Sequence, residues 1–422
     1  MEQNRPSVLF LLILGSFLGL TLLSGVSGCG PCGPAVAHGP LRWYKGNTHT
    51  HSLWSDGDAA PEHIADWYKS HGYDFLVLSD HNILLQGEKW VKVGPGKGRV
   101  PPEHLADLAR RFGAATVELR EKAGLSEMKL KTLTELRRRF EEPGRFLFIH
   151  GEEITDKFME QVGGKEVERP VHHGSFNHVD LIPPPHGASV REVLERTMAA
   201  VEAEAKKCGR PVLVHLNHPN FGWGVTPDDL ARVPGERYFE VYNGHRGVRN
   251  YGDADHLSTE KIWDYVLTLR LTTLGGPPLY AFATDDAHSY HVEQGISNPG
   301  RGWVMVRADA LDASTLTEAM LRGDFYATSG VVLDEVAATR ESLSIRIAAQ
   351  PGVSYRTKFI GTRKGGAAGE LLQEVEGAAA SYVFKGDEVY VRATVVSTAP
   401  HPNGYEKGDL QTAWVQPVVR NK

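Results

Sequence analysis

Short apolar runs recur along this 422-residue chain, and several of them lead directly into histidines and carboxylates. The runs at 75–78, 146–149, 211–214 and 280–283 are followed by Asp80-His81, Gly151-Glu-Glu153, His215-Leu-Asn-His218 and Asp285-Asp-Ala-His288. In a barrel-like α/β enzyme the loops after the strands converge on one face, so residues at strand ends meet there. The pattern therefore predicts an α/β fold whose strand ends gather ligand-type side chains at one site.

The first such motif, His49-Thr-His51, ends a predicted strand at 41–48. Alternate residues of a strand point to the same face, so the two imidazoles would lie side by side. Asp56 follows in a Ser-Asp-Gly turn and offers a hard oxygen ligand. Zinc, manganese and iron all accept imidazole together with carboxylate. A histidine pair of this kind also occurs on solvated strands, so the metal prediction depends on the later motifs.

Taken in order, the motifs resemble those of the PHP superfamily, the polymerase and histidinol phosphatase type metallohydrolases, over roughly residues 44–330. The matching pieces are His49-Thr-His51 with Asp56, Ser79-Asp-His-Asn82, Gly151-Glu-Glu-Ile-Thr155, His218-Pro219 and Asp286-Ala-His288. Within the superfamily the chain is most similar to the carbaryl-hydrolase-like (CehA/McbA) branch, because Glu240-Val-Tyr-Asn243 follows the His-Pro pair. The resemblance implies an α/β fold with a distorted TIM-like (β/α)7 barrel at residues 43–330.

The resemblance also implies two or three divalent metal ions, of manganese, iron or zinc. The implied ligands are His49, His51, Glu153 and Asp286 for one ion, Glu153, His178 and His218 for a second, and Asp56, His81 and His288 for a third. Glu153, Asp286 and His218 are the expected catalytic residues, with Glu153 bridging two ions. Two alternatives stay open: His173 in place of His178, and His215 in place of His218.

Further residues are expected around these ligands. Asp80, Asp285 and Glu240 are predicted to orient neighbouring imidazoles. Arg246, in the loop after the strand at 238–243, could clamp an anionic substrate oxygen, and an exposed basic loop is the competing interpretation. His215 is the other candidate for substrate contact.

The ligand set implies a hydrolase that uses a metal-bridged hydroxide, without a serine or cysteine nucleophile. Phosphoesters are the first expected substrates, because metal clusters clamp phosphoryl oxygens. The alternative is a carbamate or carboxylic ester hydrolase of the carbaryl-hydrolase type, and a non-catalytic, metal-containing surface binding module is a third hypothesis. A net charge of −6 gives no basic footprint for nucleic acid, so the expected partner is a small molecule.

The N-terminus is predicted to be a lipoprotein-type signal peptide at residues 1–28, followed by a linker at 29–42. Arg5 precedes an apolar run at 8–23, and Val26-Ser-Gly-Cys29 resembles a bacterial lipobox with Cys29 as the lipidated residue. Cleavage after Ala35-Val-Ala37, which would release a soluble protein, is one alternative, and a retained membrane anchor is another. All three predict export, and the lipobox predicts a periplasmic or cell-surface protein anchored to the membrane.

The remaining chain is assigned from periodicity and composition. Helices are predicted at 61–71, 190–207, 258–269 and 315–322, a helical insert at 87–145, a polar loop at 156–170 and a βαβ unit at 303–328. Short alternating runs separated by Gly, Pro and Asp predict a small β-sandwich domain at 331–422. Cys29-Gly-Pro-Cys32 copies a redox C-x-x-C motif but lies beside the leader and outside any βαβ unit, which argues against a redox function.

Overall fold

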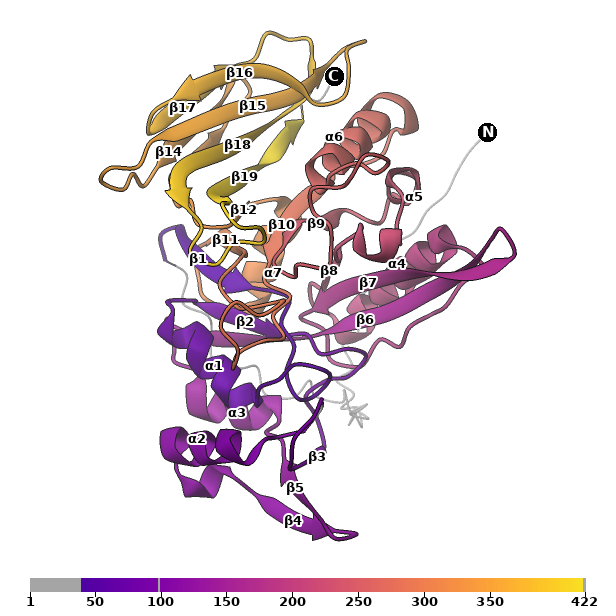
Figure 1. The fold of residues 1–422 in the computed structure, drawn as a ribbon. Coiled ribbons are helices and arrows are strands. Elements are labelled where there is room, and N and C mark those ends of the chain that lie inside the picture. The colour runs from indigo at the N-terminus through magenta and orange to yellow at the C-terminus, as the bar shows by residue number, and fades with distance from the viewer. Residues whose placement is uncertain (1–38, 98, 420–422) are drawn as a thin grey trace, which may run out of the picture. The chain divides into compact units, whose positions relative to one another are not determined.

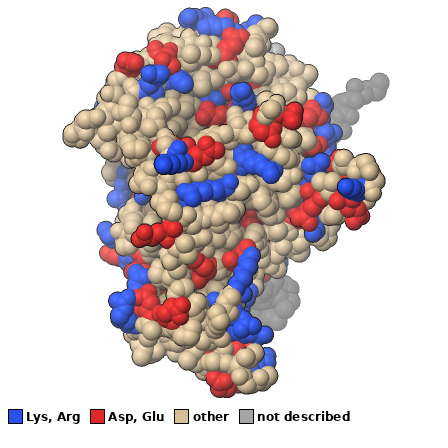
Figure 2. Space-filling model, in the orientation of Figure 1, with Lys and Arg blue, Asp and Glu red and all other residues tan. Residues whose placement is uncertain are grey.

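The computed structural model describes residues 39–97 and 99–419 (Figure 1). The predicted signal peptide, Cys29, the 35–37 cleavage site and most of the predicted linker lie outside these residues. Within them, no helix combines the length and the apolar character that a membrane crossing requires. Lysine and arginine are interspersed with aspartate and glutamate on the face drawn in Figure 2.

A mixed sheet of 13 strands forms the framework. Its strands are, in spatial order, β10 (Tyr280–Thr284), β9 (Tyr238–Asn243), β8 (Leu213–Leu216), β7 (Lys165–Phe176), β6 (Leu147–Val162), β2 (Phe75–Leu78), β1 (Arg42–Asn47), β11 (Trp303–Ala308), β12 (Phe325–Thr328), β19 (Leu410–Val419), β18 (Glu388–Pro400), β15 (Tyr355–Arg363) and β16 (Glu370–Glu376). The expected α/β class is confirmed, while the pairing is that of a large mixed sheet.

Two groups of parallel strands carry the predicted motifs. Strands β1, β2 and β6 are parallel, and so are β8, β9 and β10. All residues of β2, β8 and β9 are buried. The unbroken apolar run of β2 is typical of a strand covered on both faces. Strand β7 joins the two groups and is antiparallel to both β6 and β8.

The predicted polar loop at 156–170 is wrong. Strands β6 and β7 form one long hairpin (magenta in Figure 1) that pairs from Gly151 opposite Phe176 to Val162 opposite Lys165. Gly163 and Gly164, both at positive φ, supply the turn, as a two-residue hairpin connection requires. The outer part of the hairpin leaves the core, so charged residues occupy both of its faces and hide the strand alternation.

Seven α-helices accompany the sheets: α1 (Pro61–Ser70), α2 (Pro102–Phe112), α3 (Leu133–Phe140), α4 (Val190–Cys208), α5 (Pro227–Arg232), α6 (Thr259–Leu269) and α7 (Ala313–Arg322). Three single turns, η1 (Ala114–Thr116), η2 (Phe221–Trp223) and η3 (Arg270–Leu274), complete the helical segments described. Local sequence sets the helix ends. Ser189 caps α4 by accepting a hydrogen bond from the Glu192 backbone, and Gly209 ends that helix in the left-handed region.

The insert at 87–145 is only partly helical. Its two helices, α2 and α3, accompany a small sheet of β3 (Trp90–Lys92), β5 (Leu125–Lys129) and β4 (Leu119–Lys122). Ala123 and Gly124, both at positive φ, form the tight turn between β4 and β5. The spacing of apolar residues predicted helix throughout the insert. Strands of three to five residues are too short for their apolar spacing to be distinguished from that of the neighbouring helices.

The last part of the chain continues the main sheet. Strands β11 and β12 are antiparallel, so the predicted βαβ unit at 303–328 is wrong, and β12 pairs directly with β19. A second sheet of β13 (Leu333–Ala338), β14 (Ser342–Ile347) and β17 (Ala379–Val383) shares a buried core with β15, β18 and β19. This region therefore has two β layers, one of which is part of the main sheet, and His38–Lys422 form one compact unit. Independent folding of residues 331–422 stays a prediction.

Candidate metal centre

The side chains singled out from the sequence lie where strands β1, β2, β8 and β10 end, and beside Glu153 within β6. Two isolated parallel bridges continue the pairing beyond the strands, between Thr50 and Ala287 and between His81 and Glu153. The first is reinforced by the His51 backbone N–H, which donates to the Ala287 carbonyl at 3.0 Å. The Thr50–Ala287 bridge joins the segments after β1 and β10, and the His81–Glu153 bridge joins the segment after β2 to β6. The side chains of these segments therefore lie near Glu153.

The innermost group combines His49, His51 and Asp286. One carboxylate oxygen of Asp286, Oδ1, lies 3.2 Å from the Nε2 atom of each of the two histidines. Both oxygens of Glu153 face the same imidazoles, with Oε1 at 3.4 Å from His49 Nε2 and Oε2 at 3.4 Å from His51 Nε2. All four residues are buried.

Glu153 also faces a second set of imidazoles. Its Oε1 atom lies 3.3 Å from His218 Nε2 and 3.2 Å from His172 Nδ1, and its Oε2 atom lies 2.7 Å from His81 Nδ1. The single carboxylate therefore stands between groups of ligand atoms on both sides. That is the position required of a carboxylate that bridges two cations.

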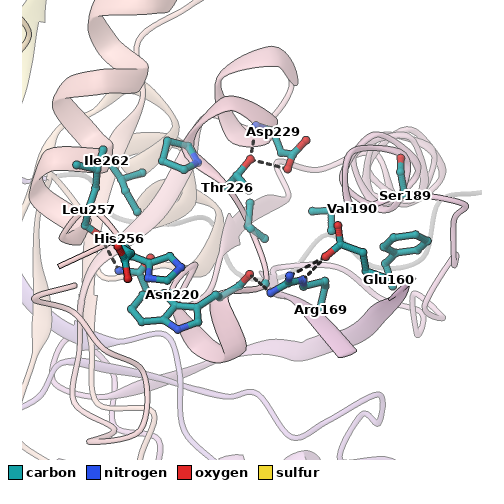
Figure 3. Close-up of a pocket in the computed structure, with 16 residues that line it drawn as sticks. Glu160, Arg169, Ser189, Val190, Asn220, Thr226, Asp229, His256, Leu257 and Ile262 are labelled. Atoms are coloured by element: carbon teal, nitrogen blue, oxygen red, sulfur yellow. Dashed lines mark hydrogen bonds and ion pairs between the residues drawn. The ribbon is translucent and has the colours of Figure 1, made fainter. Parts of the chain in front are cut away.

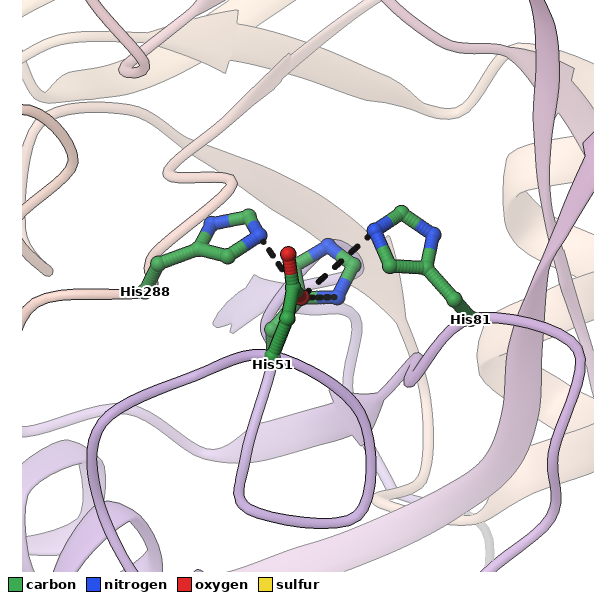
Figure 4. A group of neighbouring side chains, drawn as sticks. His51, His81 and His288 are labelled. Atoms are coloured by element: carbon green, nitrogen blue, oxygen red, sulfur yellow. Dashed lines mark ion pairs between the residues drawn. The ribbon is translucent and has the colours of Figure 1, made fainter. Parts of the chain in front are cut away.

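A third group surrounds Asp56 and is the most accessible part of the centre. Asp56 Oδ1 lies 3.2 Å from His288 Nε2, 3.6 Å from His81 Nε2 and 3.8 Å from His51 Nδ1. Figure 4 shows the imidazoles of His51, His81 and His288 close together in this group. The side chains of Asp56 and His81 are 34% and 27% exposed, whereas those of His49, His51 and Glu153 are fully buried. The centre is therefore most open to solvent on the Asp56 side.

The donor atoms fit divalent metal ions. His51 Nε2 and His172 Nδ1 are buried and have no hydrogen-bond partner, although buried polar atoms in folded proteins are normally satisfied. Both atoms point into the groups just described. A mixed set of imidazole nitrogens and carboxylate oxygens suits manganese, iron and zinc alike.

Electrostatics hold two of these donors, His51 and Glu153, in the form that binds cations, whereas nearby carboxylates outweigh burial and raise the pKa of His49, His81 and His288. Burial, together with His288 and His81, lowers the pKa of His51 to about 3, so its imidazole is neutral. Burial alone would raise the pKa of Glu153, yet His81, His49 and His172 outweigh it and hold that pKa well below its usual range. Metal ions require neutral imidazoles and ionised carboxylates, and these two residues present those forms.

Glu240 lies behind His49, as predicted for a residue that orients an imidazole. Its Oε1 atom accepts a hydrogen bond from His49 Nδ1 at 2.7 Å, which directs Nε2 toward Asp286 and Glu153. Thr284 Oγ1 donates to the same carboxylate at 2.6 Å, and the His218 backbone N–H donates to its other oxygen at 2.7 Å. Glu240 thus couples the positions of two candidate ligands.

Asp80 and Asp285 have other roles than the predicted one. The Asp80 carboxylate accepts hydrogen bonds from the backbone and hydroxyl of Ser52 and from the hydroxyl of Ser55, so it shapes the loop that carries Asp56. Asp285 accepts from the Tyr68 hydroxyl at 2.8 Å and from two backbone N–H groups at 301 and 302. Both carboxylates hold loops in place.

His172, and not the predicted His178, lies in the centre. His178 Nδ1 bonds to the Asp180 carbonyl at 2.9 Å and its Nε2 to the Ser175 carbonyl at 3.1 Å, away from the centre. Because β7 runs antiparallel to β6, residues 172–174 of β7 lie beside Glu153 and Thr155, and the C-terminal end of β7 lies beside the start of β6. The prediction selected His178 as the histidine that opens an expected strand at 179–182, and these residues form no strand.

The alternatives His173 and His215 also lie outside the candidate groups. His173 Nε2 bonds to the buried Glu236 carboxylate at 2.8 Å. His215 is buried, its ring stacks on Phe282 at 4.7 Å, and its Nε2 lies 3.2 Å from Thr48 Oγ1. His215 is therefore a core residue, which corrects its prediction as a substrate contact, and of the pair His215 and His218 the structure brings His218 to Glu153.

Arg246 does not face the centre. Its guanidinium donates to the carbonyls of Tyr405 and Gln294, at 3.1 and 3.3 Å, and ties two loops together. The cation that approaches the centre is Lys97, whose Nζ lies 3.9 Å from Asp56 Oδ2. Sequence reasoning missed this lysine. The signal was the glycine-rich stretch before it, in which Gly94 and Gly96 adopt positive φ and so mark an irregular loop.

No family model and no curated protein matches this chain. Among solved structures, one similar chain is a two-domain protein from Bacteroides vulgatus described as containing a predicted PHP-like metal-dependent phosphoesterase. It is 14% identical, the alignment covers 92% of this chain and 100% of the other, and the TM-score is 0.37. A similarity this low leaves the geometry of the centre as the basis for functional inference.

Proposed function

We propose that this protein is a metal-dependent hydrolase of the PHP type that acts on phosphoesters. The observation that carries the proposal is that nine candidate ligands form adjoining groups. They are His49, His51, Asp56, His81, Glu153, His172, His218, Asp286 and His288. Two or three divalent ions would be held by these residues. When bound, such ions activate water and polarise a phosphoryl or carbonyl oxygen.

The chain's own residues support that chemistry in three ways. Glu240 fixes the His49 imidazole by a 2.7 Å hydrogen bond. Asn217 Nδ2 donates to Glu153 Oε1 at 2.8 Å and so orients the carboxylate between the groups. Lys97 adds a positive charge at the exposed side of the centre, which favours an anionic substrate such as a phosphoester over a neutral carbamate.

We interpret strands β1, β2 and β6 to β10 as a distorted seven-stranded barrel of the PHP type, within the CehA/McbA-like branch. The support is the Thr50–Ala287 bridge, which links the segment after β10 back to the segment after β1. A buried cluster with side chains from all seven of these strands, including Phe75, Phe176 and Phe282, fills the space that such a ring would enclose.

We further propose that the protein is exported and anchored through Cys29. The support is the sequence of residues 1–28, with Arg5, the apolar run at 8–23 and the lipobox-like end. Mass spectrometry of the mature N-terminus tests this directly. A lipidated Cys29 is the expected result, and a mature chain that begins near His38 would show ordinary signal-peptidase cleavage instead.

The activity is tested with the chain from residue 39 onward, loaded with manganese or zinc. The substrates are p-nitrophenyl phosphate, bis-p-nitrophenyl phosphate, an aryl acetate and an aryl carbamate. We expect metal-dependent turnover of the phosphates that is lost in Asp286→Ala, while circular dichroism shows that the variant stays folded. Turnover of the carbonyl substrates alone would identify a carbaryl-type hydrolase, and metal binding without turnover a non-catalytic module.

A further inference from the structure

A cavity of about 500 Å³ lies between the β6–β7 hairpin, the starts of α4 and α5 and the loop before α6 (Figure 3). None of the candidate ligands lines it. Its volume falls within the range of about 300–1,000 Å³ that small-molecule sites occupy. It is therefore large enough to hold part of a substrate.

Two segments lead from the metal centre into the wall of this cavity. Asn220 lines the cavity and follows His218 by two residues, so their Cα atoms are at most about 8 Å apart. On β7, Arg169 lines the cavity three residues before His172, which corresponds to about 10 Å along a strand. Phe221 follows Asn220, and its ring lies 5.2 Å from that of His218. The cavity thus begins about one substrate length from the centre.

The segment from His218 to Trp223 has an unusual and well-fixed backbone. His218 and Trp223 are non-glycine residues at positive φ, 23° and 52°. The Asn220 side chain holds the turn by donating to the carbonyls of Arg249 and Leu257, both at 3.0 Å. Strained backbone of this kind persists where the surroundings fix it and is concentrated at binding and catalytic sites.

The lining of the cavity disfavours a second anion. Three carboxylates, Glu160, Asp229 and Asp255, line it together with one guanidinium, that of Arg169. Arg169 already binds Glu160 through Nε and Nη2, at 2.7 and 2.6 Å. A phosphate in the cavity would face excess negative charge, so the phosphoryl group belongs at the metal centre.

The same wall offers hydrogen-bonding groups beside apolar surface. Figure 3 shows the Arg169–Glu160 pair on one side of the cavity and Asn220 with His256 on the other. The His256 ring stacks on Trp223 at 3.8 Å, and Leu257 and Val190 add aliphatic surface. Paired polar groups next to aliphatic side chains suit an uncharged ring that carries hydroxyl groups.

We propose that this cavity binds the sugar ring of a phosphorylated substrate whose phosphate lies at the metal centre. The inference rests on the proposed phosphoesterase function and adds its substrate class. The carboxylates and Arg169 would accept and donate hydrogen bonds to the hydroxyl groups, and the ring would pack against the apolar wall.

Steady-state kinetics of the manganese-loaded full chain test this assignment. The substrates are a hexose 6-phosphate, ribose 5-phosphate, phosphoethanolamine and p-nitrophenyl phosphate. We expect Arg169→Ala and Asp255→Ala each to raise KM for the sugar phosphates about tenfold, because each removes a hydrogen bond to a charged group. The kcat values and the KM for p-nitrophenyl phosphate should stay within about twofold.

The matched control is Lys157→Ala. It removes the Lys157–Glu168 ion pair, at 2.7 Å, from the same hairpin without touching the cavity lining. Equal effects of Lys157→Ala and Arg169→Ala would overturn the assignment, because they would indicate a general effect on the hairpin. A preference for phosphoethanolamine would also overturn it, since the carboxylates would then bind a cation.

A result that contradicts the proposed phosphoesterase function can be distinguished from one that contradicts sugar binding in the cavity. If no phosphoester is turned over, binding of free hexose is measured by saturation-transfer NMR on the full chain. Binding that is lost in Asp255→Ala, an exposed loop residue whose replacement leaves the core intact, supports the sugar site on its own. Absence of hexose binding in the unmodified chain overturns it.

Discussion

At the scale of single residues, Glu153 sets the geometry of the centre. Its two oxygens lie between 2.7 and 3.4 Å from nitrogen atoms of five histidines: His49, His51, His81, His172 and His218. A buried carboxylate with so many imidazole neighbours would be costly without positive charge between them. Bound cations would supply that charge, and without them Glu153 and the neighbouring carboxylates raise the pKa of His49 and His81, so that these imidazoles carry it.

His172 and His178 provide a sharp test of the ligand assignment, because one lies at Glu153 and the other faces backbone carbonyls. We expect His172→Ala to weaken metal binding at least about tenfold, as loss of a ligand does, and His178→Ala to leave it unchanged. Metal content after dialysis against a chelator, measured by plasma mass spectrometry, checks this. The opposite ranking would restore the assignment made from the sequence.

Glu240 tests the orienting role. In Glu240→Gln one carboxylate oxygen becomes an NH₂ group, which cannot accept a hydrogen bond. The side chain then loses either the bond from His49 Nδ1 or the bond from the His218 backbone N–H. We expect metal affinity to fall about 10- to 100-fold, the usual effect of losing such a partner. Competition with a fluorescent chelator measures the affinity.

The control for Glu240→Gln is Glu236→Gln. Glu236 is also fully buried and also pairs with a histidine, His173, at 2.8 Å, but outside the candidate ligand groups. A similar loss of affinity in both variants would mean that any disturbed buried pair weakens the centre, and the orienting role would be refuted.

At the scale of elements, the sequence was informative wherever a strand is parallel and buried. The apolar runs that form β2, β8 and β10 could be recognised, and their C-terminal ends lead to His81, His218 and Asp286. Strand β7 could not be handled this way, because the centre lies beside residues within the long β6–β7 hairpin and not at the end of an apolar run. That is why His172 was missed while His178 was selected.

Helices α1 and α2 start with the same residues, Pro-Glu-His, yet bury them differently. Glu62 in α1 is 4% exposed, whereas Glu103 in α2 is exposed. Burial raises the pKa of Glu62 to about 7, compared with 4.5 for an ordinary glutamate. In the folded protein this residue therefore keeps its proton at pH values where the unfolded chain has lost it.

The pH dependence of stability follows from that shift. Between pH 4.5 and about 7 the folded state binds the extra proton, so the free energy of unfolding falls as the pH rises through this window. We expect Glu62→Gln to stabilise the chain at pH 8 by on the order of 3 kcal/mol and to have little effect at pH 4. Urea unfolding of chelator-treated protein at both pH values measures this, and Glu103→Gln should change neither value.

At the scale of the whole molecule, the C-terminal strands are joined to the part of the chain that carries the centre. Strand β19 pairs with β12, with Ala327 opposite Trp414. The Gln416 side chain bonds to both the backbone N–H and the carbonyl of Ala281 in β10, at 2.9 and 2.8 Å. Tyr390 and Trp414 belong to the same buried cluster as residues of α6 and β9. These strands thus support the strand that ends in Asp286.

The strongest polar link between the two regions is the pair of Arg392 in β18 and Asp264 in α6. The guanidinium is 1% exposed and donates to both carboxylate oxygens at 2.7 Å. Removing one partner leaves the other charge buried and uncompensated, which costs about 3–5 kcal/mol. We therefore expect Arg392→Met to lower the free energy of unfolding by about that amount, and urea unfolding at pH 7 measures it.

The matched change on the same sheet is Arg356→Met, which removes the exposed ion pair with Glu374 at 3.6 Å. Exposed pairs contribute about 0–1 kcal/mol, so this variant should unfold almost like the unmodified chain. If Arg392→Met instead gives two separate unfolding transitions, with the metal-binding region unaffected, residues 331–422 form an independent domain. A single transition shifted to lower urea means that the C-terminal strands and the metal centre unfold together, because β12 and β10 depend on β18 and β19 for their pairing and packing.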